Sequence, residues 1–262
     1  MDKEDYGFEY VIDASDKELF ARPFHKDDMA AVVEYAKSIT INPDNYRTYL
    51  GIGCAPTFRK TGALLETSEE ELREIAGRPD QYFSLGLWSG DQELLAFVTL
   101  QLEDVDQFLT DRQNVAFNSE FENKWDEWLE YKNHRIMAFR GDLAIRGRTA
   151  YSGLRDILYY LALKELRKRG IRYCVTEVFH IVDCMDRDGM HGVNVFNNPS
   201  FVSQIEGGGA VYVGDYKIMT KQIGEGISIR YYAKLLEYRV EHLYQICGEM
   251  LERKSIRVIQ TG

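Results

Sequence analysis

The stretch "LAIRGRTAYSGLRDILYYLALKELRKRGIRYCVTEV", residues 143–178, decides the fold. An apolar run, two arginines and several small residues precede a segment with helical spacing, and a second apolar run follows it. Three consecutive cations and Gly170 end the helical segment, as suits the negative end of a helix dipole. A strand that returns through one helix to a parallel neighbour is a βαβ unit. The stretch therefore predicts an α/β fold. The apolar face of its helix consists of Leu154, Ile157, Leu158, Leu161 and Ala162.

The loop before this helix has the composition of an anion-binding site. Arg146 and Arg148 flank a glycine, and mostly small residues lead on to Gly153. The first backbone amides of a helix lack internal partners and carry partial positive charge, so a phosphate or pyrophosphate would satisfy them. Guanidinium groups would add charge-assisted contacts. An ordinary loop with two solvated arginines is the alternative that these residues leave open.

Composition limits the classes of function. The 262 residues are 45% hydrophobic and 13% aromatic, enough for a packed core. With 32 basic and 42 acidic residues the net charge is -10, which argues against a nucleic-acid partner. No apolar run reaches the roughly 20 residues that cross a bilayer, and the acidic start does not resemble a secretion signal. The four cysteines are scattered, as in a reducing compartment. We expect a cytoplasmic protein without a membrane span.

Further elements follow from local patterns. Two β-prone runs flank a turn at residues 89–92 and predict a hairpin. The acidic, aromatic segment at about 104–135 predicts a helical insertion over the core. We expect residues 1–214 to form the core, and 215–262 to add a strand and a long helix. Residues spaced four and three apart predict that this helix packs on the chain's own core, with a homodimer contact as the alternative. They are Leu236, Val240, Leu243, Cys247 and Met250.

The segment "HIVDCMDRDGMH", residues 180–191, concentrates histidine, cysteine and aspartate. His180 and Asp183 could ligate one ion, but the spacing matches no metal motif and no EF-hand loop. We interpret the segment as a polar loop above the strand ends and expect no metal.

The order of these elements resembles the GNAT N-acyltransferase superfamily. Four pieces carry the resemblance and together span about residues 20–36 and 82–213. They are "FARPFHKDDMAAVVEYA", "YFSLGLWSGDQELLAFVTLQL", the opening stretch extended to start at Asp142, and "NVFNNPSFVSQIEGGGAVYV". The resemblance implies a mixed, twisted sheet flanked by helices. It also implies transfer of an acyl group from acetyl-CoA or a longer acyl-CoA to a small-molecule amine.

The resemblance also assigns residues to the coenzyme. Backbone amides in the loop would hold the pyrophosphate, the strand before it would pair with the pantetheine arm, and Asn197 or Asn198 would lie nearby. Tyr151 stands where the family has the first glycine of this loop. The loop residues are Arg148, Thr149, Ala150, Tyr151, Ser152 and Gly153, and the strand residues are Leu143, Ala144 and Ile145.

The implied chemistry needs a base for the amine and an acid for the thiolate. Glu177, Asp142 and His180 are the candidate bases, and Glu177 could equally be a structural acceptor. The family's acidic tyrosine has no counterpart at the expected helical position, although Tyr212 and Tyr216 follow on a predicted strand. Two alternatives remain. An acyl carrier protein could be the donor, meeting the loop arginines and the basic helix end "ELRKRG", or the domain could be catalytically silent and bind a ligand or partner protein.

Overall fold

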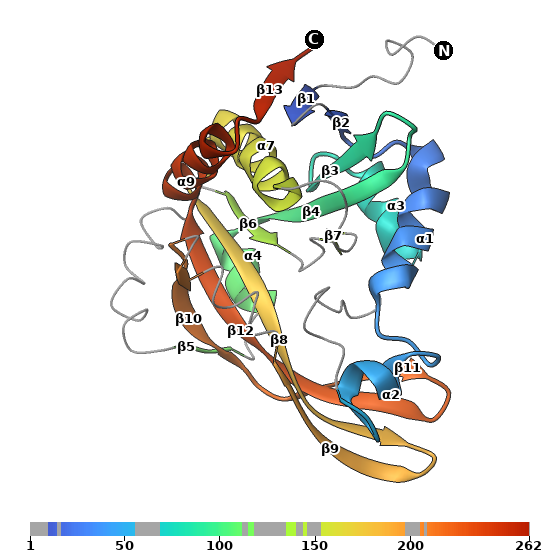
Figure 1. The fold of residues 1–262 in the computed structure, drawn as a ribbon. Helices are drawn as coiled ribbons and strands as arrows, with labels where there is room; N and C mark the ends of the chain where they lie inside the picture. Colours follow the sequence, from blue (N-terminus) through green and yellow to red (C-terminus); the bar gives the residue numbers. More distant parts are fainter. Residues whose placement is uncertain are drawn as a thin grey trace.

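The chain folds around one mixed sheet, to which thirteen described strands contribute (Figure 1). The computed structural model describes residues 10–14, 17–55, 69–111, 115–117, 135–139, 144–145, 153–196, 205–206 and 209–261. The strands are β1 (Tyr10–Ala14), β2 (Lys17–Arg22), β3 (Tyr82–Ser89), β4 (Leu94–Asp104), β5 (Val115–Phe117), β6 (Arg135–Phe139), β7 (Ala144–Ile145), β8 (Tyr173–Asp186), β9 (Gly189–Phe196), β10 (Val211–Tyr216), β11 (Met219–Gly224), β12 (Ile227–Arg239) and β13 (Arg257–Gln260). The helices are α1 (Met29–Ile39), α2 (Tyr46–Leu50), α3 (Glu69–Gly77), α4 (Val105–Asp111), α7 (Leu154–Lys168) and α9 (Val240–Arg253).

The strand order confirms the predicted mixed sheet. The strands run β13-β1-β2-β3-β4-β6-β8-β12-β10-β5, with β7 beside β4, β9 beside β8 and β11 beside β12. Among the described strands only β6 and β8 pair in parallel, with Met137 opposite Cys174. Helix α7 connects them, so the predicted βαβ unit is present. Its first strand differs from the expectation, because β7 pairs antiparallel with β4 and the parallel neighbour of β8 is the earlier strand β6.

The predicted hairpin is confirmed as β3 and β4. The Gln92 amide donates to the Ser89 carbonyl at 3.0 Å, and the Ser89 amide donates to Glu93 at 2.9 Å. Every residue of β3 is buried, which explains why its sequence lacks the alternation of a half-exposed strand.

Helices cover both faces of the sheet. Leu19 and Ala21 of β2 belong to a core shared with α7 and α9, whereas Phe20 between them packs in a cluster with α1. Successive side chains of a strand point to opposite faces, so these helices lie on opposite sides of the sheet. Figure 1 shows α7 and α9 together near β13, and α1 with α3 beside β3 and β4.

The C-terminal helix predicted from residues spaced four and three apart is present, but it starts after the first of these residues. Leu236 lies in β12, and the helix begins at Val240. The buried residues of α9, including Leu243 and Cys247, join the core beneath α7. β13 then pairs with β1, placing Arg257 opposite Asp13.

The segment predicted as a helical insertion is described only in part. Its described residues form α4 and β5, and β5 pairs with β10 at the edge of the sheet. Residues 118–134 lie outside the described part, so the helical prediction is not tested there.

The glycines at the two ends of α7 allow a test of local strain. Gly153 has a φ of 84°, and a Cβ there would lie 2.9 Å from Ile256 Cδ1; Gly170 has a φ of 72° and open space around it. We expect Gly170→Ala to lower the free energy of unfolding by about 1 kcal/mol from the left-handed backbone alone, and Gly153→Ala to lower it by more. Urea unfolding followed by circular dichroism measures both, and equal losses would contradict the close contact.

Candidate active site

The parallel pairing at the centre of the sheet is interrupted. β6 pairs with β8 as far as Phe139 opposite Thr176, and β7 beyond it pairs with β4. The register of β4 shifts by two residues between its pairing with β6 and its pairing with β7. On β8, the same edge is taken up again by β9 from His180. No described strand therefore lies beside residues 177–179 on that edge.

Helix α7 is the next element after β7 along the chain. Its first turn carries an ion pair. Asp156 is 5% exposed and accepts a hydrogen bond from Lys254 Nζ at 2.5 Å. A Cβ on Gly153 would lie 3.6 Å from the same ammonium group. The carboxylate suits the positive end of the helix dipole, and Lys254 adds a cation beside the first amides. Lys254 comes from the turn after α9, and no local sequence pattern indicated its position here.

Glu177 is half-buried at the interruption, with a tyrosine beside it. The Tyr216 hydroxyl, on β10, donates to Glu177 Oε1 at 2.6 Å. Tyr231 lies on the neighbouring strand β12, and burial followed by the charge of Glu177 raises the pKa of Tyr231. Its ring meets that of Phe179 edge-on at 5.5 Å. Because Val178 joins the core beneath α7, Glu177 next to it points to the opposite face of the sheet. A carboxylate and a phenol in hydrogen-bond contact can exchange a proton.

His180 belongs to a different network. Its Nδ1 lies 2.5 Å from the Tyr232 hydroxyl and its Nε2 lies 2.6 Å from Asn194 Oδ1, so both ring nitrogens have polar partners. The ring also contacts Phe196, which packs against the core on the α7 side. His180 therefore lies on the other face of the sheet from Glu177, and these two candidate bases do not share a site.

The remaining predicted site residues are described unevenly. Ala144 and Ile145 form β7, and Gly153 precedes the first residue of α7. Nine others lie outside the described residues: Asp142, Leu143, Arg148, Thr149, Ala150, Tyr151, Ser152, Asn197 and Asn198.

The polar segment at residues 180–191 is a hairpin of β8 and β9, which corrects its interpretation as a loop. Asp186 accepts hydrogen bonds from the Tyr46 hydroxyl and pairs with His191 Nε2, both at 2.8 Å, and so ties α2 to the hairpin. Asp183 pairs with Arg230. These contacts give the acidic residues structural partners. Within the described ranges, no group of three or more potential metal ligands is gathered.

Searches with the sequence match no protein-family model and no curated protein. Solved structures do match. NAA60 of Arabidopsis thaliana in complex with acetyl-CoA is 12% identical, with a TM-score of 0.50, over 85% of this chain and 99% of that one. Spermidine N-acetyltransferase from Vibrio cholerae in complex with CoA and spermine is 14% identical, with a TM-score of 0.42, over 86% of this chain and 97% of that one. The chain has the fold of the GNAT N-acetyltransferases.

In the part of the chain that the structure describes, no helix combines the length and the apolar composition needed to cross a membrane.

The contacts of Asp186 with Tyr46 and His191 predict how the stability of the folded protein changes in acid. Its hydrogen bond from Tyr46, followed by its contacts with His191, lowers the pKa of Asp186 to about 2 from an ordinary value of 3.8. Because the folded pKa is depressed, the contribution is present above about pH 4 and is lost as the pH falls to about 2. Asp186→Asn should be less stable at neutral pH and should lose less stability over that interval. Urea midpoints measured across the interval check this, with Asp188→Asn, on an exposed carboxylate, as the control. A full acid-dependent loss in Asp186→Asn would contradict the assignment.

Proposed function

We propose that this protein is an N-acyltransferase, which moves an acyl group from an acyl-CoA thioester to an amine by direct attack. The observation that carries the proposal is the contact between Glu177 and Tyr216 at the point where the pairing of β6 with β8 ends. The GNAT fold supports it, because the solved relatives include N-acetyltransferases in complex with CoA or acetyl-CoA. A fold alone does not define a function, which depends on the residues of the site.

The pair supplies both proton transfers. The free amine attacks the thioester carbonyl, a C–N bond forms, and the nitrogen gives its proton to Glu177, directly or through a water molecule. The C–S bond breaks, and the leaving thiolate takes the hydroxyl proton of Tyr216. Tyr216 then recovers a proton from Glu177 through their 2.6 Å hydrogen bond. The pair thus ends the cycle as it began, with no net gain or loss of protons.

The donor would lie beside β7 and the part of β8 that follows its pairing with β6. In this proposal the backbone of Leu143, Ala144 and Ile145 pairs with the pantetheine arm, and amides from Arg148 to Gly153 hold the pyrophosphate, with Asn197 or Asn198 nearby. Half-burial of Glu177 among aromatic rings would exclude bulk water from the attacked carbonyl.

Binding of the donor is the first test. Calorimetric titration with acetyl-CoA and longer acyl-CoAs should give heat of binding, and thiol release should follow when a panel of small amines is added. A parallel titration uses an acylated acyl carrier protein. Turnover with the carrier protein alone would replace the coenzyme A donor in this proposal. Absence of turnover with every thioester would defeat the transferase and favour a silent ligand-binding domain.

The proton transfers are tested by substitution at the pair. Glu177→Gln and Tyr216→Phe should each lower kcat by roughly 100-fold or more, because each removes one proton transfer. KM for the thioester should change little. Tyr231→Phe is the matched control, since Tyr231 lies near the same carboxylate, and it should retain the parent kcat. If Tyr216→Phe behaves like Tyr231→Phe, the acid is another group.

A further inference from the structure

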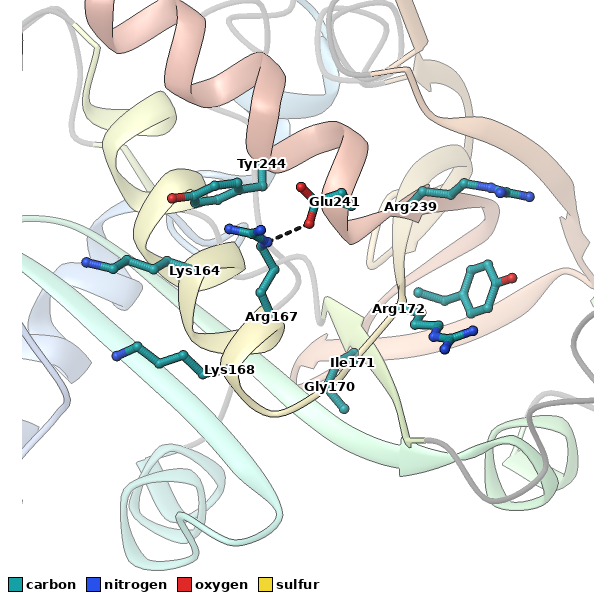
Figure 2. Close-up of a pocket in the computed structure, with 10 residues that line it drawn as sticks. Lys164, Arg167, Lys168, Gly170, Ile171, Arg172, Arg239, Glu241 and Tyr244 are labelled. Carbon is teal, nitrogen blue, oxygen red and sulfur yellow. Dashed lines mark hydrogen bonds and ion pairs between the residues drawn. The ribbon is translucent and has the colours of Figure 1, made fainter.

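A concentration of basic residues lies at the end of α7 remote from Gly153. A hollow of about 750 Å³ opens there between the end of α7, the start of β8 and the start of α9 (Figure 2). Five of its lining residues are cations and one is an acid: Lys164, Arg167, Lys168, Arg172, Arg239 and Glu241. We call these six residues the basic surface. It carries a formal charge of +4 on a chain whose net charge is -10.

Helix dipoles and ion pairs favour part of this charge, since Lys168 pairs with Glu165 at 3.2 Å and Arg167 pairs with Glu241. Arg167 and Lys168 lie in the last turn of α7, where cations complement the helix dipole. Arg172 precedes β8, and Arg239 ends β12 immediately before α9. The start of α9 adds partial positive charge of its own, so the dipoles give no reason for two more arginines there.

The cations are spread across the surface and do not point at one spot. Figure 2 shows Lys164 and Lys168 extending from one side of α7, and Arg172 and Arg239 on the other side of the hollow. Arg167 lies between them, donating to Glu241 Oε2 at 2.6 Å with its guanidinium 4.3 Å from the centre of the Tyr244 ring. A single phosphate could contact only a fraction of these groups, whereas an extended ligand could contact them all.

We propose that the basic surface docks an acidic segment of a partner protein. Charge complementarity carries the choice, because carboxylates spaced along a segment match cations spaced across the surface. Arginine and tyrosine are the residue types that anchor protein interfaces, and Arg167 stacked on Tyr244 presents both. A short segment covers the surface and little else. A long nucleic acid or an anionic bilayer would also face the rest of a chain with net charge -10.

This site is separate from the proposed thioester site. The 15 residues of α7 span about 22 Å, and the two sites lie at its opposite ends. The inference therefore stands or falls independently of the acyltransferase, and its test needs no turnover.

The test uses the full chain and a fluorescein-labelled peptide of glutamates alternating with serines. Fluorescence anisotropy should show binding that weakens as salt rises. The double variant Lys168→Glu/Arg172→Glu should weaken binding at least about tenfold, because attraction becomes repulsion at two positions. The control Arg73→Glu/Arg253→Glu makes the same charge change at exposed residues elsewhere and should bind like the parent. Circular dichroism verifies that each variant folds.

Three results would overturn the proposal: no binding by the parent chain, equal binding by the two double variants, or tighter binding of a single-stranded oligonucleotide or of phosphatidylserine vesicles than of the peptide. Carbodiimide coupling of the peptide, mapped by mass spectrometry, gives an independent readout. Crosslinks at Lys164 and Lys168 would support the assignment, and crosslinks confined to lysines elsewhere would refute it.

Discussion

The proposed site depends on one interruption in backbone pairing. β6 and β8 are held together for three residue pairs, and then β7 pairs with β4 while β8 remains with β12. A strand within a sheet normally has both edges occupied by hydrogen-bonding neighbours. An extended ligand can add to a backbone edge that no strand occupies, as in strand addition by peptides, and no described strand occupies β8 between its pairings with β6 and β9. Glu177 is the first residue of β8 beyond the pairing, so its position follows from where the pairing stops.

Much of this architecture could be predicted from local sequence patterns. The helical spacing around Leu158, the termination at Gly170 and the turn near Gly90 each correspond to an element of the structure. These signals are local, because periodicity and turn chemistry act over a few residues. Pairing between distant strands has no such signal. The sequence therefore indicated a strand before the loop but could not indicate that β6, which precedes β7 in the chain, is the parallel neighbour.

Tyr216, the hydrogen-bond partner of Glu177, also could not be predicted from local sequence patterns. Tyr212 and Tyr216 lie four residues apart on one strand, and regular alternation would place them on one face. The register of β10 against β12 shifts between Tyr212 and Gly214, so Tyr216 reaches the face of Glu177 while Tyr212 packs with the core on the other side. A single extra residue in a strand has this effect, and neither composition nor spacing reveals it. His180 was a candidate base because residues 180–191 were interpreted as a loop. In the structure it lies in β8, three residues after Glu177, and alternation along the strand places it on the opposite face.

The pairing of β13 with β1 bears on how the chain reaches its final form. Residues 10 and 260 are opposite one another, so this edge of the sheet forms through one of the longest loop closures available to the chain. During synthesis, β1 and β2 leave the ribosome long before residues 257–260 do. For that period the outer edge of β1 presents unsatisfied amides and carbonyls, which invites pairing with other chains until the segment after α9 covers it.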